Sequence, residues 1–116
     1  MEKTKKFSVI KENHLFLRAY GKGKSFVSDG LAVYVLRGRD RKKTLVGFTV
    51  SKNRGNAVLR NSLRRRMREA YRILYPFVKD GYIIVIVARQ ACSQFSSTEL
   101  CEQMHALFRK AALFNN

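Results

Sequence analysis

The sequence has few of the residues from which catalytic, disulfide-bonded or metal-binding sites are built. Its 116 residues include two cysteines, two histidines, eight acidic residues, one proline and no tryptophan. Cys92 and Cys101 are too far apart for a CxxC motif and too few for a disulfide framework or a four-ligand zinc site. We therefore expect a structural or incidental role for both. Because the sequence also has no carboxylate pair, nucleophile elbow or metal-ligand motif, it predicts no catalytic residue and no metal site in the protein itself.

Long apolar runs are absent as well. None approaches the roughly 20 residues of a membrane-spanning helix, and the polar start "MEKTKKFSV" has no apolar stretch to serve as a secretion signal. These absences predict a cytoplasmic protein. With 46% hydrophobic residues, residues 1–116 have the length and the apolar content of a single domain.

Positive charge is the feature that the sequence has in excess. It contains 24 Lys and Arg against 8 Asp and Glu, which gives a formal net charge of +16 and a pI near 10.6. The charge is concentrated between residues 37 and 72, where thirteen basic residues face two acids. A chain of this charge is expected to bind polyanions, and nucleic acid is the leading candidate.

The apolar pattern predicts both helices and strands. "KENHLFLRAY" predicts a short amphipathic helix that stops at Gly21 and Gly23, with "YGKGKS" as a turn. "FVSDGLAVYVLR" and "TLVGFTVS" predict two antiparallel strands separated by the charged turn "GRDRKK". In the second strand, alternation directs Val46, Phe48 and Val50 to the core. "YIIVIVAR" predicts a strand in the interior of the sheet, and the end of the chain predicts a helix that opens with a capping box from Ser96 to Glu99. The order indicates an α+β sandwich on one sheet.

Residues 54–72, "RGNAVLRNSLRRRMREAYR", contain seven arginines and one acid. The segment predicts a helix with Gly55-Asn56 as turn and N-cap and with Pro76 beyond its end. At about 100° per residue, one side collects the apolar residues Leu59, Leu63, Met67, Ala70, Tyr71, Ile73 and Leu74. The other side collects Arg60, Asn61, Arg64, Arg65, Arg68 and Arg72. Arg66 falls inside the apolar arc, and we expect its side chain to extend to solvent.

The basic side of this helix indicates an external anion. A helix held by surface ion pairs would mix Glu with Arg four residues apart, whereas here arginines 60, 64, 68 and 72 form a row of like charges that repel one another. The planar guanidinium can bind a phosphate through two hydrogen bonds or stack on a base, which favours RNA or DNA over a membrane surface. Asn61 has a donor and an acceptor for a base edge, a ribose hydroxyl or a hydrated metal ion on RNA. A merely polar surface role for Asn61 is an equal alternative.

Aromatic residues distinguish single-stranded from duplex partners, because unpaired bases stack on Phe or Tyr while a duplex offers mainly phosphates. Phe16, Tyr20 and Tyr34 are the candidates for stacking. Core packing is the alternative for each of them.

The segment from Ser51 to Arg72, "SKNRGNAVLRNSLRRRMREAYR", resembles the signature of the protein subunit of bacterial ribonuclease P. That family has a basic helix with an Arg-Asn pair followed by further arginines, in the arrangement "GNAVxRNxxKRxxR". "HLFLRAYGKGKSF" resembles the family's N-terminal helix and turn, "VGFTVSK" its strand before the basic helix, and "YIIVIVAR" the strand after it. The resemblance therefore covers nearly the whole chain.

The resemblance implies both a fold and a function. The fold is a two-layer α/β sandwich on one mixed sheet, like domain 2 of ribosomal protein S5, with a left-handed strand-helix-strand crossover through the basic helix. The function is that of a protein cofactor to a catalytic RNA, and together they remove the 5′ leader from precursor tRNA by hydrolysing a phosphodiester. The RNA carries out the hydrolysis and holds most of the Mg²⁺. The protein binds no metal by itself, is monomeric alone, and joins the RNA as one copy.

The resemblance also implies two groups of site residues. Residues that contact the catalytic RNA are Lys52, Asn56, Arg60, Asn61, Arg64, Arg65 and Arg68. Residues that line the cleft for the single-stranded leader are Phe16, Tyr20 and Tyr34. The sequence departs from the family pattern in two places, because Tyr20 stands where Phe is frequent and Asn53 stands where a second lysine is common. The chain also ends soon after its last helix, without a basic tail.

Three other hypotheses compete with this one. A non-enzymatic RNA-binding protein, such as a ribosomal protein or a ribosome-assembly factor, would share the charge and the size. A helix-turn-helix DNA-binding protein could use residues 57–74 as its recognition helix, although "VGFTVS" predicts a strand where the preceding helix belongs. A peripheral membrane protein would need the apolar arc of the basic helix, which the core also needs.

Overall fold

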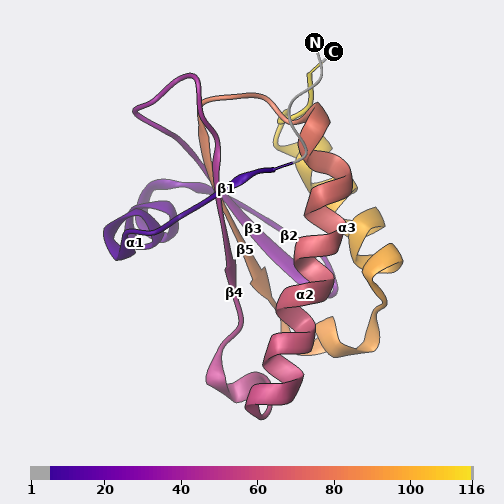
Figure 1. Ribbon diagram of the computed structural model, residues 1–116. Helices are drawn as coiled ribbons and strands as arrows, with labels where there is room; N and C mark the ends of the chain where they lie inside the picture. Colours follow the sequence, from indigo (N-terminus) through magenta and orange to yellow (C-terminus); the bar gives the residue numbers. More distant parts are fainter. Residues whose placement is uncertain (1–5, 116) are drawn as a thin grey trace.

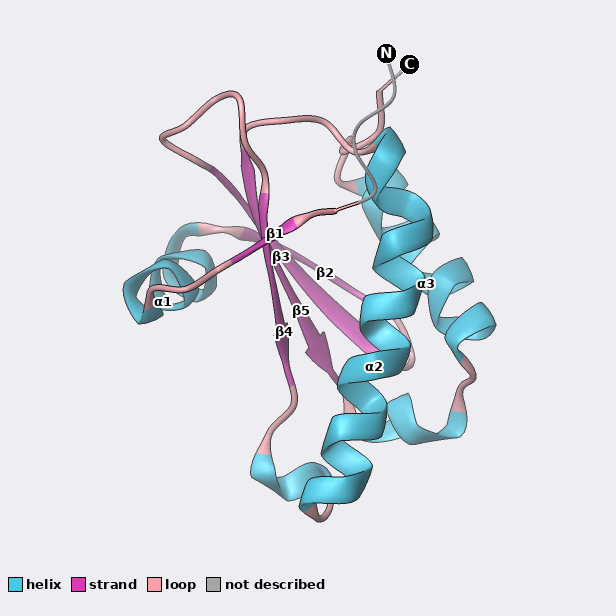
Figure 2. Ribbon diagram, viewed as in Figure 1, coloured by secondary structure: helices cyan, strands magenta, loops and turns pink. Residues whose placement is uncertain are grey.

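The computed structural model describes residues 6–115, in which three α-helices pack on a five-stranded sheet (Figures 1 and 2). The strands are β1 (Ser8–Val9), β2 (Lys24–Val27), β3 (Leu31–Arg37), β4 (Leu45–Thr49) and β5 (Tyr82–Ala88). The helices are α1 (Asn13–Lys22), α2 (Ala57–Leu74) and α3 (Ser97–Lys110). Three short 3₁₀ turns complete the chain: η1 (Lys52–Arg54), η2 (Tyr75–Phe77) and η3 (Gln90–Gln94). The predicted α+β class is confirmed.

The apolar strand β5 lies in the middle of the sheet, as its sequence predicted. The strand order is β1-β4-β5-β3-β2, and β5 pairs antiparallel with β3 and parallel with β4. Because the basic helix α2 connects the parallel strands β4 and β5, these three elements form the strand-helix-strand crossover that the resemblance implied. The element before α2 is β4 followed by the three-residue η1, not a helix, so the helix-turn-helix hypothesis is wrong.

The pairing of the early strands differs from the prediction. β3 and β4 run in opposite directions, but β5 lies between them, so they do not form a hairpin. The hairpin is instead inside "FVSDGLAVYVLR", where β2 and β3 pair around a turn at residues 28–30. The side-chain oxygen of Gln103, from α3, accepts hydrogen bonds from Ser28 Oγ at 2.6 Å and from the Gly30 amide at 2.9 Å. A contact across this distance in sequence has no signature in the local pattern.

The larger core lies between the sheet and the helices α2 and α3, which cover one face (Figure 1). Five of the seven residues of the predicted apolar arc are buried: Leu63, Met67, Ala70, Tyr71 and Leu74. From the sheet, Val46 and Val50 are buried in the same core and Phe48 packs against it, as the alternation predicted. Leu59 is partly buried against the same core, whereas the Ile73 side chain is 62% exposed. At about 100° per residue it lies at the edge of the arc, beyond Arg66.

A smaller core lies on the opposite face, beneath α1 (Figure 1). Ala19 is buried there against Ile10, Ile83 and Val85, so α1 adds a partial layer to the predicted sandwich. The helix ends at Lys22 with Gly23 as its C-cap, so of the two glycines predicted to stop it, Gly23 does so and Gly21 lies inside the helix. A Cβ on Gly23 would lie 2.5 Å from the Ala19 carbonyl oxygen, so this residue has to be glycine for the chain to leave the helix here.

The ends of the two long helices are fixed by the predicted caps. Asn56 Oδ1 accepts a hydrogen bond from the Leu59 amide at 2.9 Å, and Ser96 and Glu99 form the reciprocal capping box. Arg66 does not extend freely to solvent as expected. Its Nη1 donates to the carbonyl oxygens of Ser93 and Phe95, each at 3.2 Å, so this arginine ties α2 to the turn before α3.

Candidate nucleic-acid interface

The outer face of α2 has unneutralised positive charge. Asn61, Arg65, Arg68 and Arg72 are exposed, and Arg60 and Arg64 are half-buried. Within residues 6–115, no arginine of α2 forms an ion pair. Their contacts are with uncharged groups: Arg64 Nη1 donates to Asn61 Oδ1 at 3.2 Å, and the Arg68 guanidinium lies 5.8 Å from the centre of the Phe48 ring. The helix therefore presents a row of cations without an internal counterion, as predicted.

The N-terminal end of α2 adds to this charge. Lys52 is exposed in η1, and Ser51 Oγ fixes that turn by accepting a hydrogen bond from the Asn53 amide at 3.0 Å. Gly55 then adopts φ 135°, a conformation that favours glycine. The first turn of α2 contains no acidic residue, so the positive end of the helix dipole is left for an external anion. The Asn56 oxygen is used for capping, and its NH₂ group is the part left for a partner.

Two buried nitrogen atoms at this end of α2 have no hydrogen-bond partner among residues 6–115. They are the Nε atoms of Arg54 and Arg60. Buried polar groups in folded proteins are nearly always hydrogen-bonded, so two unpaired donors in one place suggest a missing acceptor. Both arginines lie beside the residues that the sequence associated with RNA.

The three candidate stacking residues lie on the other face of the sheet, where two of their rings are in contact. Phe16 and Tyr20 lie one turn apart on α1, and the rings of Tyr20 and Tyr34 meet edge to face with their centres 5.0 Å apart. Tyr20 Oη and Thr49 Oγ1 share a hydrogen bond of 3.1 Å. Tyr20 is 39% exposed, whereas Phe16 and Tyr34 are half-buried. We call Phe16, Tyr20 and Tyr34 the aromatic cluster.

Strand β4 connects the aromatic cluster with the basic face. Gly47 and Thr49 point towards α1, where a Cβ on Gly47 would collide with the Phe16 ring. Phe48 points to the opposite face and packs beneath Arg68. Thr49, at the end of the strand, is three residues before Lys52. The sequence did not identify Gly47, Phe48 and Thr49 as parts of these surfaces, although the alternation of β4 placed their side chains on the correct faces.

The described part of the chain contains no cluster of the side chains that commonly bind metal ions. Within residues 6–115, no three His, Cys, Asp or Glu side chains come together, and the basic face presents hydrogen-bond donors, which do not fit a divalent cation that takes oxygen ligands. Cys92 and Cys101 are free. Burial raises the pKa of both thiols, which favours their protonated form. In the same range, no helix has the length and hydropathy to cross a membrane.

Comparison with known proteins agrees with this geometry. The sequence model of the family described as Ribonuclease P matches residues 4–112. The ribonuclease P protein component of Symbiobacterium thermophilum is 38% identical over 109 residues, which cover 94% of this chain and 95% of that protein. That of Clostridium beijerinckii is 35% identical over 113 residues, covering 92% and 90%.

Solved structures show the same fold. The RNase P protein of Staphylococcus aureus superposes with a TM-score of 0.83 at 30% identity, over 95% of this chain and 100% of that one. The RNase P protein of Thermotoga maritima superposes with a TM-score of 0.76 over 88% and 96%, at 23% identity. Their fold is consistent with the predicted likeness to domain 2 of ribosomal protein S5. With its sequence matched along almost its full length and its sheet shared with these structures, the chain belongs to the ribonuclease P protein family.

Proposed function

We propose that this protein is the cofactor of a ribonuclease P ribonucleoprotein. It binds the catalytic RNA and the 5′ leader of precursor tRNA, and it promotes the endonucleolytic removal of the leader. The observation that carries this proposal is the basic face of α2, which has no internal counterion within residues 6–115. Strand β4 connects it with the aromatic cluster on the other face of the sheet, where Tyr20 is partly exposed. A ribosomal protein would need the charge, but it would have no need for stacking residues directed to a leader.

The basic face would hold the catalytic RNA through its phosphates. The seven residues proposed for this contact are Lys52, Asn56, Arg60, Asn61, Arg64, Arg65 and Arg68. The hydrogen bond between Arg64 and Asn61 orients one guanidinium before RNA arrives, so less side-chain entropy is lost on binding. The buried, unpaired Nε of Arg60 would gain an acceptor. Charge-assisted hydrogen bonds of this kind are about twice as strong as neutral ones.

The aromatic cluster would hold the unpaired leader. Tyr20 offers the most exposed ring of the three, and its contacts with Tyr34 and Thr49 keep that ring in one orientation. A base can therefore stack without first ordering the side chain. Phe16 lies one turn before Tyr20 on α1 and packs on Gly47, and it would contribute a second ring to the leader site.

The hydrolysis itself would be performed by the RNA. The described protein residues offer no acid-base pair at the basic face, and Mg²⁺ would be held by RNA oxygens, since arginine donors repel cations. The protein would neutralise phosphates where the RNA and the precursor meet and would increase the affinity for the leader. We propose that it acts in the cytoplasm, is monomeric alone, and joins the RNA as one copy.

Binding of precursor tRNA and of mature tRNA to the assembled ribonucleoprotein tests the leader contact. We expect Tyr20→Ala to weaken binding of the precursor by about 5-fold or more, the contribution of one stacked base, and to leave mature tRNA unaffected. Leu17→Ala is the matched control, because Leu17 is also on α1 and is 61% exposed but is not a member of the cluster. Equal losses on both tRNAs would contradict a leader contact at Tyr20.

A further inference from the structure

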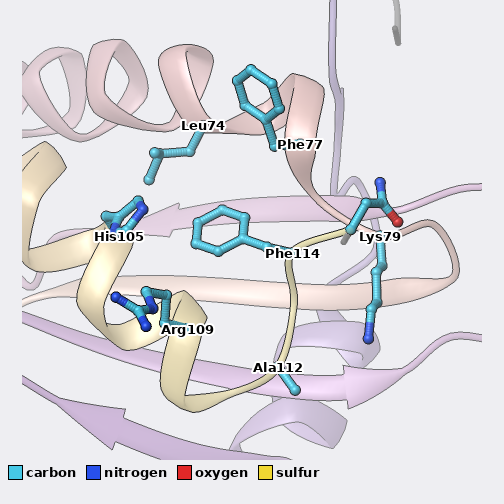
Figure 3. Close-up of a pocket in the computed structure, with 8 residues that line it drawn as sticks. Leu74, Phe77, Lys79, His105, Arg109, Ala112 and Phe114 are labelled. Atoms are coloured by element: carbon cyan, nitrogen blue, oxygen red, sulfur yellow. The ribbon is translucent and has the colours of Figure 1, made fainter. Parts of the chain in front are cut away.

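A cavity of about 620 Å³ lies at the opposite end of α2 from Asn56, where α2 and α3 both finish. Phe77 and Lys79 line it from the segment after α2, His105 and Arg109 line it from α3, and Phe114 lines it from the end of the chain (Figure 3). Its volume is within the range of small-ligand sites. Leu74 lines it from the end of α2, and Arg68, the proposed RNA contact nearest to it on that helix, lies six residues earlier, about 9 Å along the helix axis.

The end of the chain is folded back to form this cavity. After α3, Ala112 adopts φ 56°, a left-handed conformation that is unfavourable for a residue with a Cβ. The amides of Ala112 and Leu113 donate to the carbonyl oxygens of Arg109 and Phe108, each at 3.0 Å, which is the Schellman ending usually made with glycine. These bonds satisfy carbonyl groups at the negative end of α3. An anion in the cavity is therefore repelled less by the C-terminal end of α3 than it would be by unpaired carbonyl groups.

The folded segment is then held by pairing with residues 77–79. The Lys79 amide donates to the Leu113 carbonyl at 2.7 Å, and the Asn115 amide donates to the Phe77 carbonyl at 2.9 Å. The Phe114 ring stacks on His105, with the ring centres 5.0 Å apart and the planes 35° from parallel. The cavity walls are thus fixed by backbone hydrogen bonds on one side and by ring packing on the other.

The lining combines cations with aromatic rings. Lys79 and Arg109 lie on either side of Phe114 (Figure 3), and none of the lining residues, all of them in the described part of the chain, is acidic. Phe77 is 58% exposed. The cations can bind a phosphate and the exposed ring can stack on a base, so a nucleotide can interact with both groups. An acidic peptide would use the cations and leave Phe77 in water.

We propose that this cavity binds an unpaired segment of the catalytic RNA, with a base against Phe77 and with phosphates contacting Lys79 and Arg109. The inference rests on the proposed function, which makes RNA the partner. The leader is not the occupant, because the aromatic cluster lies beneath α1 on the other face of the sheet. The protein would then contact the RNA at both ends of α2 and fix the distance between two RNA segments.

The first test compares two double variants of equal charge in binding to a bacterial ribonuclease P RNA without tRNA. Lys79→Ala/Arg109→Ala removes the cavity cations, and Lys42→Ala/Lys110→Ala removes two exposed cations outside the cavity. We expect the first pair to lower the slope of log affinity against log salt by about 0.7 to 0.9 for each phosphate that is no longer neutralised, and the second pair to change it less. Equal changes in the two variants would overturn the proposal.

The second test examines the exposed ring in the same assay. We expect Phe77→Ala to weaken RNA binding by about fivefold or more, the lower end for one stacked base, and Phe77→Trp to preserve it. Ile73→Ala is the control, because Ile73 is 62% exposed and lies nearby on α2 outside the cavity lining. Unchanged binding by Phe77→Ala, or a loss that appears only with leader-bearing precursor, would overturn the proposal.

A reference variant separates this inference from the proposed function. Arg65→Ala/Arg68→Ala alters the basic face of α2 and leaves the cavity intact. If this variant weakens RNA binding while both cavity tests show no effect, the cavity proposal alone is wrong. If it also binds normally, the proposed function has failed.

Discussion

The two faces of the sheet use the same strands for different purposes. On one face, α2 and α3 seal a core in which Met67, Tyr71, Met104 and Phe108 are fully buried. On the other, α1 covers only a small cluster and leaves Tyr20 partly in solvent. The first face provides the hydrophobic stabilisation and the second presents rings to a partner. The difference indicates that core substitutions on the first face should cause loss of folding, whereas substitutions of the rings on the second face should cause loss of leader binding.

The largest expected effect is on stability, and it concerns the face of the sheet that α2 and α3 cover, which we call the sealed face; the face under α1 is the open face. We expect Phe108→Ala to lower the free energy of unfolding by about 3–5 kcal/mol, because it removes a fully buried ring and leaves a cavity. Urea unfolding measures this loss. Tyr20→Ala, on the open face, should cost less than about 1 kcal/mol, since its ring is partly exposed. Similar losses for the two variants would show that the open face also supports the fold.

A second prediction concerns the outer side of the sealed face. We expect Arg65→Ala/Arg68→Ala to weaken binding to the catalytic RNA by about 3 kcal/mol, the lower end for two charge-assisted hydrogen bonds. The salt slope should fall by roughly 0.7 to 0.9 for each phosphate contact removed. Thermal unfolding should be unchanged, because both side chains are exposed. Arg41→Ala/Lys42→Ala is the control, because it removes the same amount of charge from the loop before β4, outside the proposed RNA contacts. An unaltered slope in the helix variant would remove these arginines from the phosphate interface.

A third prediction concerns Gly47, which lies in β4 against the Phe16 ring of α1. We expect Gly47→Ala to cost roughly 1–3 kcal/mol of stability, because the added methyl group collides with the Phe16 ring. The displaced ring should also weaken binding of leader-bearing precursor. Gly21→Ala is the control, since nothing lies within 4 Å of its added Cβ, and alanine in a helix should stabilise by about 0.5–1 kcal/mol. Unchanged leader binding in Gly47→Ala would separate Phe16 from the leader site.

The smallest effect concerns one hydroxyl in the sealed core. Tyr71 Oη is buried without a hydrogen-bond partner among residues 6–115, and burial raises the pKa of this phenol far above its usual range, so it stays neutral. We expect Tyr71→Phe to stabilise the fold by about 1 kcal/mol in urea unfolding, because an unsatisfied polar group leaves the core. Tyr20→Phe, which removes the exposed hydrogen bond to Thr49, should be neutral or slightly destabilising. A destabilised Tyr71→Phe would mean that the buried hydroxyl has a partner in the folded protein.

Much of the fold follows from local sequence pattern, because that pattern decides whether a segment is helix or strand. The boundaries of α2, the central position of β5 and the capping box of α3 were all predicted. Strand pairing was not, since β5 lies between β3 and β4 although it follows both in sequence. Arg66 was also misjudged. Its partners, the carbonyl groups of Ser93 and Phe95, are brought near only by the packing of α3.

The candidate site was predictable to the same extent. The arginine row needs only the period of one helix, so the sequence was enough to place it. The contact between Tyr20 and Tyr34 joins α1 to β3, and its third partner Thr49 comes from β4, so it depends on the completed sheet. The C-terminal cavity has no sequence signature, because it depends on the left-handed turn at Ala112 and on pairing with residues 77–79.

The most direct test of the central claim is cleavage of a precursor tRNA by a bacterial ribonuclease P RNA at limiting Mg²⁺, with and without this protein. We expect strong stimulation that depends on the 5′ leader, is lost in Arg65→Ala/Arg68→Ala and is retained in Arg41→Ala/Lys42→Ala. Binding to the RNA without stimulation of cleavage would contradict the cofactor function and would favour an RNA-binding protein of the ribosomal kind.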